Sequence, residues 1–287
     1  FSGEVNIPSS KSHLHRALIC AALGDKPCRL YYNGSSDDVV ATINCLNALG
    51  AEIEDKIEYF AINPIKEAKN AILPCNESGS TLRFMLPVAC ALGVECTITG
   101  TKKLLSRPLE PLVSELVRHG AIIEKNEDDI KVSGRLMPGN YSVRGDISSQ
   151  FITGLLLATS LIDGESCIHL TGKVESRPYI TMTQKPMSLF GVDCEDFTVR
   201  GGTFRSPGEI TVEGDWSNGA FFLAAKALGS SLEVLNLSET SAQGDRASAH
   251  WLGLLPKEHC TIDATDIPDL VPILAVVAGA CHGAKFT

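Results

Sequence analysis

The chain has 287 residues, enough to bury a substantial hydrophobic core and more than one domain usually contains, so we expect two domains. Its formal net charge of −9 argues against general binding to nucleic acids or anionic membranes, and no apolar run is long enough to cross a bilayer. Ten cysteines without a C-x-x-C pair indicate free thiols in a reducing cytoplasm rather than disulfides or a metal site.

The first predicted helix covers Leu14 to Ala22, where apolar residues recur at helical spacing. Ser9 and Ser10 are candidate N-caps, and Gly24 ends the helix. The elements predicted next are a strand at 29–32, a helix at 38–49 and strands with a charged face between 52 and 62.

This order of elements recurs along the chain. It starts again at Ser80, at Ser148 and, less completely, at Ser217. The intervals between the glycines that end successive helices are 69, 71, 65 and 54 residues, for Gly24, Gly93, Gly164, Gly229 and Gly283. Such a period indicates one supersecondary unit copied along the chain, and its mixture of helix and strand predicts a closed α/β domain with internal symmetry.

The repeat also predicts the domain boundaries. Three copies, residues 12–212, would form one domain, and residues 1–11 with 213–287 would form part of a second. The pattern is weakest between Asp245 and Asp263, where the interval shortens. The chain opens on Phe1 and ends at Thr287 where a strand begins, so we expect a longer protein with a second domain that is incomplete here.

Polar residues interrupt the apolar pattern at the starts of several predicted helices. At the first helix, Ser12 and Arg16 share a face and Lys11 precedes them. Free backbone N–H groups and the positive end of the helix dipole suit such a place to a phosphate or carboxylate. A capping serine beside two solvated basic residues is the structural alternative.

The segment 76–83, Asn-Glu-Ser-Gly-Ser-Thr-Leu-Arg, is the second such place. Gly79 allows the backbone to approach a ligand closely, Ser80 or Thr81 can cap the following helix, and Arg83 lies one turn inside it. The segment lacks both the G-K-[ST] ending of a P-loop and the G-x-G-x-x-G of a dinucleotide fold, so a plain capped turn is the alternative.

Further polar helix starts occur in the third copy. Ser148, Ser149 and Gln150 precede an apolar run, and the segment 176–179, Ser-Arg-Pro-Tyr, lies where a strand gives way to a helix. Arg107-Pro108 occupies the corresponding place one copy earlier. Each has a structural explanation on its own, but their occurrence at equivalent ends of successive repeats favours a shared site.

These segments, in this order and followed by Ile267-Pro268-Asp269, resemble the 5-enolpyruvylshikimate-3-phosphate synthase family over nearly the whole chain. The resemblance implies a two-domain inside-out α/β barrel built from β-α-β-α-β-β units. It also implies transfer of the enolpyruvyl group of phosphoenolpyruvate to the 5-hydroxyl of shikimate 3-phosphate, without a metal or organic cofactor and with glyphosate as inhibitor. We expect a monomer whose partners are these two small molecules.

The resemblance also implies roles for individual residues. Those implied for shikimate 3-phosphate are Lys11, Ser12, Arg16, Ser148, Ser149, Gln150, Ser176, Tyr179 and Asp269. Those implied for phosphoenolpyruvate are Lys11, Gly79, Arg107 and Gln150. Asp269, expected at the end of a strand, would accept the proton of the attacking hydroxyl, and Lys11 is the second catalytic candidate.

Two departures leave alternatives open. The family's later Lys-Glu-x-x-Arg segment and its final cationic phosphate ligands have no counterpart in these residues, and the stretch between Gln243-Gly244-Asp245 and Asp263 is shorter than a full unit. A non-catalytic module that binds phosphorylated sugars is therefore one alternative. The other is a UDP-N-acetylglucosamine enolpyruvyl transferase, which would start with Lys-Asn where this chain has Lys11-Ser12 and commonly carries a reactive cysteine in a mobile loop.

Overall fold

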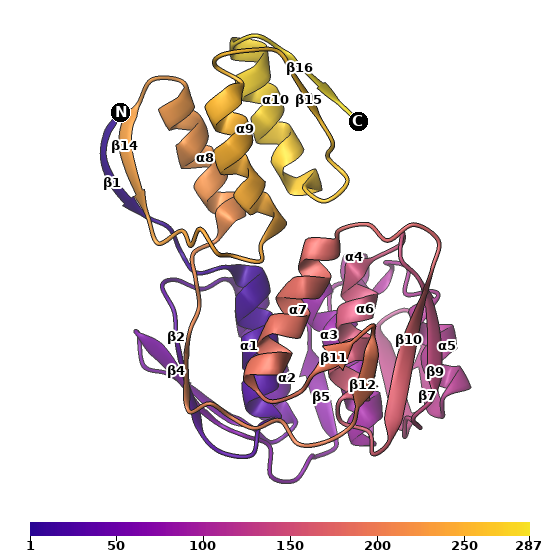
Figure 1. Ribbon diagram of the computed structural model, residues 1–287. Helices are drawn as coiled ribbons and strands as arrows, with labels where there is room; N and C mark the ends of the chain where they lie inside the picture. Colours follow the sequence, from indigo (N-terminus) through magenta and orange to yellow (C-terminus); the bar gives the residue numbers. More distant parts are fainter.

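The computed structural model describes residues 1–287 and contains two separate hydrophobic cores. The larger core has 57 buried residues drawn from Leu14 to Val212, and the smaller has 11 drawn from Ala220 to Ala278. Figure 1 shows the two bodies one above the other, joined by two connecting segments of the chain. No helix combines the length and the apolar character needed to cross a membrane.

The first unit of the larger body takes its first strand from a distant part of the chain. Its elements are α1 (Lys11–Ala22), β2 (Cys28–Tyr31), α2 (Asp37–Ala48), β3 (Glu52–Asp55) and β4 (Tyr59–Asn63). The strand that lies parallel to β2 is β13 (Glu209–Thr211), with Glu209 opposite Arg29. The sheet order is therefore β13-β2-β4-β3, and the third unit is followed by the strand that completes the first.

The second and third units repeat this order with local first strands. The second consists of β5 (Ala71–Pro74), α3 (Gly79–Leu92), β6 (Cys96–Thr99), α4 (Lys102–Leu105), α5 (Leu112–Arg118), β7 (Ala121–Lys125) and β8 (Asp129–Gly134). The third consists of β9 (Asn140–Arg144), α6 (Ser149–Thr159), β10 (Glu165–Thr171), α7 (Arg177–Leu189), β11 (Cys194–Glu195) and β12 (Thr198–Arg200). Both sheets pair as the first does, which confirms the β-α-β-α-β-β repeat.

Helices form the inside of the larger body and sheets form its wall. All residues of α6 from Phe151 onward are buried, whereas β8 alternates between buried and more exposed positions. Helices α3 and α6 approach closely because α6 carries Gly154. A Cβ there would lie 2.4 Å from the Arg83 carbonyl oxygen and 2.7 Å from Pro87 Cγ, so only glycine permits this packing.

The smaller body begins with the same order and then departs from it. Its elements are β1 (Ser2–Asn6), α8 (Trp216–Ala227), β14 (Ser231–Leu235), the 3₁₀ turn η1 (Gly244–Arg246), α9 (Ala247–Leu254), β15 (Cys260–Ile262), the 3₁₀ turn η2 (Pro268–Leu270), α10 (Val271–Ala280) and β16 (Ala284–Phe286). β1 lies parallel to β14, as β13 lies parallel to β2. After α9 the chain passes directly to β15 without the antiparallel strand pair that ends each earlier unit, which explains the shortened interval.

Two local predictions were wrong. Helix α3 begins at Gly79, and its cap is Ser78, whose Oγ accepts from Thr81 N, rather than Ser80 or Thr81. Asp269 lies in η2, beyond the end of β15, rather than at the end of a strand. The cysteines are all free.

Candidate active site

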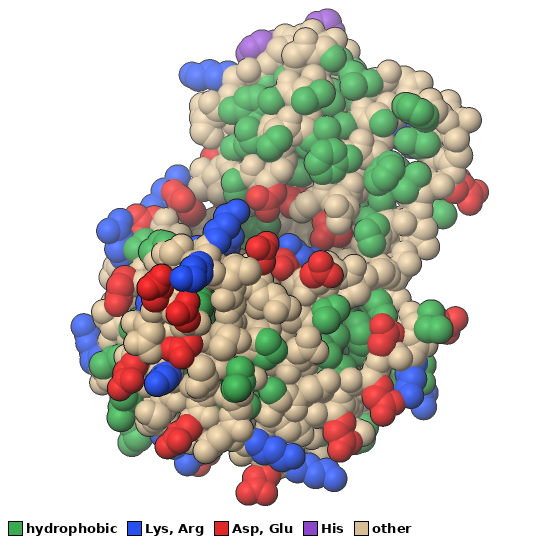
Figure 2. All heavy atoms as spheres, turned by 180° about the vertical axis from the view of Figure 1, so that it is seen from behind, with side chains coloured by type: hydrophobic (Ala, Val, Ile, Leu, Met, Phe, Trp, Pro, Cys, Tyr) green, Lys and Arg blue, Asp and Glu red, His purple; other side chains and the backbone are tan.

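The site lies between the two bodies, where helices of the larger body begin. Tyr179 Oη donates a 2.6 Å hydrogen bond to Asp269 Oδ2, and the backbone N–H of Arg177 donates to Asp266 Oδ1 at 3.1 Å. The start of α7 therefore touches the smaller body. Figure 2 shows basic and acidic side chains gathered along the cleft between the upper and lower parts of the molecule.

A cavity of about 360 Å³ opens at this place and is lined from both bodies. Its walls are Pro8, Ser9, Lys11, Ser12, Leu14, Gly34, Ser35, Ser36, Val39, Tyr179, Asp215, Ser217, Asn218 and Asp269. Four of the sequence-predicted residues meet here: Lys11, Ser12, Tyr179 and Asp269. Ser36 Oγ has no hydrogen-bond partner within the protein, so the cavity also offers an unused hydroxyl.

Lys11 and the start of α1 are held by two carboxylates. Lys11 Nζ lies 2.9 Å from Asp38 Oδ2, and its backbone N–H donates to Asp215 Oδ2 at 3.3 Å. Asp215 also caps α8, because its Oδ1 accepts from Asn218 N at 3.0 Å. The start of α1 and the start of α8 thus share one carboxylate at the cavity wall.

Arg16 is not exposed to the cavity in the way a ligand-binding side chain usually is, because only 2% of its surface is exposed. Nε donates to Thr183 Oγ1 at 2.8 Å, Nη1 to the Ser12 carbonyl at 2.7 Å, and Nη2 to Thr153 Oγ1 and the Tyr179 carbonyl. Burial lowers the pKa of Arg16 to about 10. Four of its five N–H bonds are used, and one on Nη1 is free.

A second group of predicted residues surrounds the start of α3. A Cβ on Gly79 would lie 2.7 Å from Arg107 Nη1 and 2.8 Å from Arg83 Nη1, so both guanidinium groups lie over the glycine. Arg83 Nη1 also donates to Gln150 Oε1 at 2.8 Å, and Gln150 Nε2 donates to Ser80 Oγ at 3.0 Å. The structure therefore brings together Gly79, Arg107 and Gln150, and adds Arg83.

This cluster has the electrostatics of an anion site. Burial, and secondly the charge of Arg107, lower the pKa of Arg83 from its usual value. Arg83 Nε is buried without a hydrogen-bond partner. Two adjacent guanidinium groups at a helix start would be stabilised by a bound anion such as a phosphate or carboxylate.

The remaining predicted serines start helices but belong to neither group. Ser148 caps α6, with its Oγ accepting from Gln150 N at 3.3 Å, and Ser149 is the first residue of that helix. Ser176 precedes α7 with φ of 55° and makes no side-chain cap bond. All three are half-buried, so their hydroxyl groups stay partly open to solvent.

The wall contributed by the smaller body is acidic. Asp245 Oδ2 accepts a short hydrogen bond from Ser217 Oγ, and burial, with Asp269 and Asp215 nearby, raises the pKa of Asp245 to about 6. Burial and the hydrogen bond to Asp269 raise the pKa of Tyr179 well above its usual value of 10, which keeps the phenol proton on Tyr179.

Sequence reasoning missed several residues of the site. Asp38, Asp215, Ser217 and Asp245 were not predicted, and Arg83 was noted without a ligand. A signal was present for Asp215 and Ser217: the segment 215–218, Asp-Trp-Ser-Asn, is a polar helix start like that of α1. Nothing in the sequence paired Asp38 with Lys11, because that contact joins two helices.

Solved structures share this architecture. EPSP synthase from Acinetobacter baumannii superimposes with a TM-score of 0.71 at 23% identity, covering 83% of this chain and 56% of that one. The enolpyruvyl transferase NikO from Streptomyces tendae gives a TM-score of 0.76 at 16% identity, covering 100% of this chain and 76% of that one. The fold is thus that of the enolpyruvyl transferases.

Sequence comparison narrows this class to one family. The model of EPSP synthase (3-phosphoshikimate 1-carboxyvinyltransferase) matches residues 1–272. Proteins named 3-phosphoshikimate 1-carboxyvinyltransferase from Clostridium novyi and Clostridium kluyveri are 37% and 38% identical over 98% of this chain, and the chain spans 73% and 72% of their lengths. The chain belongs to the EPSP synthase family, whose reaction is the enolpyruvyl transfer of the shikimate pathway.

Proposed function

We propose that the cleft binds shikimate 3-phosphate and phosphoenolpyruvate with the residues that the family resemblance implied for each ligand. The observation that carries the proposal is the meeting of Lys11 and Ser12 with Tyr179 and Asp269 in one cavity built from both bodies. Both substrates are polyanions, and the helix start and the arginine cluster supply cationic and N–H donors within a protein that is acidic overall.

The acceptor substrate would lie in the cavity. Lys11, Ser12, Tyr179 and Asp269 line it, and we assign Ser148, Ser149, Gln150 and Ser176 to the same ligand because each belongs to a helix start. Arg16 would contribute through the one free N–H of Nη1, while its other donors hold Ser12 and Tyr179 in place. Arg16 would thus bind the substrate and also position Ser12 and Tyr179.

Phosphoenolpyruvate would lie against the start of α3. Arg107 and the backbone of Gly79 form its site, Gln150 orients Arg83, and Lys11 would reach both ligands once it leaves Asp38. A bound phosphate would relieve the repulsion between the two guanidinium groups.

Asp269 would act as the general base. The 5-hydroxyl oxygen of shikimate 3-phosphate attacks C2 of phosphoenolpyruvate while its proton passes to Asp269, and C3 takes up a proton. The tetrahedral intermediate then loses inorganic phosphate from C2 and a proton from C3, which restores the double bond. Lys11 and the fixed guanidinium groups would stabilise the charge of the intermediate.

The test is phosphate release by the full-length protein, which should require both substrates. Asp269→Asn should still bind them in calorimetric titrations and lose about 10²–10⁴-fold in turnover. Release with UDP-N-acetylglucosamine as acceptor, but not with shikimate 3-phosphate, would support the other enolpyruvyl transferase. Binding of both substrates without release would support a non-catalytic module.

We further propose that residues 12–212 form one domain and that 1–11 with 213–287 belong to a second, because the two hydrophobic cores divide between Val212 and Ala220. We also propose that the enzyme works as a monomer in the cytoplasm. The free cysteines are consistent with a reducing compartment.

A further inference from the structure

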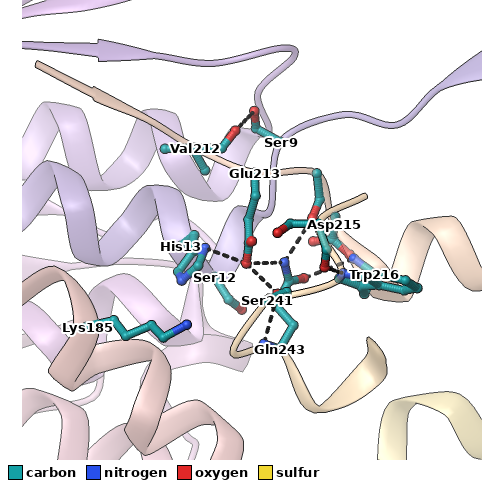
Figure 3. A network of polar contacts seen from close by, with 12 residues as sticks. Ser9, Ser12, His13, Lys185, Val212, Glu213, Asp215, Trp216, Ser241 and Gln243 are labelled. Atoms are coloured by element: carbon teal, nitrogen blue, oxygen red, sulfur yellow. Dashed lines mark hydrogen bonds and ion pairs between the residues drawn. The ribbon is translucent and has the colours of Figure 1, made fainter. Parts of the chain in front are cut away.

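One carboxylate group lies where the chain crosses from the larger body to the smaller. Glu213 follows β13 and precedes α8, and Figure 3 shows its side chain at the centre of a polar network. Its Oε1 accepts from Ser241 Oγ and from Gln243 Nε2, the latter at 3.0 Å. His13 Nδ1 lies 3.3 Å from the same oxygen. Three side chains from two bodies therefore converge on one atom.

The partners of Glu213 connect the helix starts of the cavity. His13 follows Ser12 in α1, so it lies between the predicted ligands Lys11 and Arg16 in the sequence. Gln243 Oε1 accepts from the backbone N–H of Trp216, the first residue of α8, and Gln243 Nε2 also donates to the Gly214 carbonyl. Gln243 then leads directly into η1, which carries Asp245.

The network is largely shielded from solvent. The side chains of His13 and Glu213 are 14% and 20% exposed. A cavity of about 180 Å³ adjoins it and is lined by His13, Lys185, Thr211, Glu213 and Thr240 together with apolar residues. Lys185 Nζ donates to the Thr240 carbonyl at 3.3 Å, so α7 holds the same loop from the larger body. Interactions in such a site are screened weakly.

The surroundings of His13 favour its neutral form. Burial is the main cause that lowers its pKa, the charges of Arg16 and Lys185 lower it further, and those of Glu213 and Asp215 oppose the effect. These are the charged groups that face the ring of His13 from α1, from α7 and from the segment between β13 and α8. The carboxylate of Glu213 is consequently the acceptor around which the neutral donors are arranged.

We propose that Glu213 is a positioning residue that fixes the wall carrying Ser217, Asp245 and Asp269 relative to the helix start carrying Lys11 and Ser12. The inference rests on the proposed function, because its consequence is the alignment of the two walls for reaction. A displacement of about 1 Å in such an alignment can cost about 10²-fold in rate without loss of binding.

Kinetics of the full-length protein give the first test. Glu213→Ala should lower kcat about 10–100-fold while KM for each substrate stays within about threefold, because alignment rather than contact is lost. Glu213→Gln keeps an oxygen that accepts from Ser241 and Gln243, so it should recover most of kcat. Glu209→Ala, an exposed glutamate four residues earlier on β13, is the matched control and should keep the parent kcat.

The titration of His13 tests the contact between Glu213 and the start of α1. In Glu213→Gln the ring of His13 loses the charge that favours its protonation, so the pKa of His13, followed by NMR of its ring protons, should fall. An unchanged pKa of His13 in Glu213→Gln would overturn the proposal. So would a Glu213→Ala variant that is thermally destabilised but keeps its kcat.

Hydrogen exchange without substrate provides a test that does not depend on turnover. Glu213→Ala should speed exchange of the amides at 11–14 and 215–219, while amides within α3 and α6 stay protected. Unchanged exchange at those two helix starts would overturn the proposal even if the parent protein catalysed no transfer. Absence of transfer in the parent with the expected exchange pattern would instead count against the proposed function alone.

Discussion

Tyr179 and Asp269 join the two bodies of the molecule through a single hydrogen bond of 2.6 Å between Oη and Oδ2. Tyr179 is the third residue of α7 in the larger body, whereas Asp269 lies in a 3₁₀ turn of the smaller one. The raised pKa of Tyr179 keeps its proton in place, so the phenol orients the carboxylate and leaves the other oxygen of Asp269 open to a substrate.

Removing this hydrogen bond should slow turnover. A hydrogen bond to a charged group contributes about 1.5–3 kcal/mol, so Tyr179→Phe is expected to lose about 10–100-fold in kcat/KM for shikimate 3-phosphate. Steady-state kinetics of the full-length protein provide the measurement. In an Asp269→Asn background the same substitution should cost much less, because the two residues act as a pair. Equal losses in both backgrounds would contradict the pairing.

A methyl group at Gly79 should disturb the arginine cluster. The added Cβ would lie 2.7–2.8 Å from the Nη1 atoms of Arg107 and Arg83, which are the ends of flexible side chains and would move aside. Gly79→Ala should therefore keep the stability of the parent protein. KM for phosphoenolpyruvate should rise about tenfold or more, which corresponds to about 1.4 kcal/mol, and inhibition by glyphosate should weaken.

Gly253→Ala is the matched control for that experiment. Gly253 lies in α9, and a Cβ there meets no atom within 4 Å. This variant should keep the parent KM for phosphoenolpyruvate. A Gly79→Ala protein with the parent KM and the parent response to glyphosate would show that neither ligand approaches this backbone.

Asp245 should make stability depend on pH. Its pKa is about 6 in the folded protein and 3.8 for the free side chain, so the folded state binds the proton more tightly. Ionisation of Asp245 therefore lowers the free energy of unfolding, by its full amount above pH 6. This loss disappears as the pH falls from 6 to about 4. Asp245→Asn, whose amide oxygen can still accept from Ser217, should be more stable at pH 8 by about 1–2 kcal/mol.

Urea denaturation at pH 8 and at pH 4 gives the comparison for Asp245→Asn. The gain in free energy of unfolding should be present at pH 8 and absent at pH 4. Exposed Asp193→Asn serves as the reference for the loss of one negative charge. A gain of the same size at both pH values would mean that ionisation of Asp245 is not its cause.

Arg16 should matter for folding as well as for binding. Arg16→Ala removes donors to Thr183, Thr153 and the Tyr179 carbonyl inside the core, so the free energy of unfolding should fall by about 2–4 kcal/mol. Arg16→Lys keeps the charge but not the planar fork and should recover only part of the loss. Exposed Arg205→Ala should change stability by less than about 0.5 kcal/mol. Parent stability in Arg16→Ala would contradict this interpretation of its burial.

Within the site, the helix starts were predicted best from local sequence. Lys11, Gly79, Ser149 and Arg177 are each the first residue of a helix, and Ser148 caps one as its residue type suggests. Capping and apolar spacing act within one or two turns, so a short stretch of sequence is enough to predict them. The cap of α3 was misplaced because Ser78, Ser80 and Thr81 are chemically similar candidates within four positions.

The repeated unit of the larger body is predictable from local sequence, because its helix-ending glycines and apolar faces recur at a nearly constant interval. How the units close into a body, and how the two bodies meet, depends on contacts between distant elements. Parallel pairing of β13 with β2, burial of Arg16, and the contacts of Lys11 with Asp38 and of Tyr179 with Asp269 all join residues far apart in the chain. Their partners are set by packing between elements, which no local pattern of residues specifies.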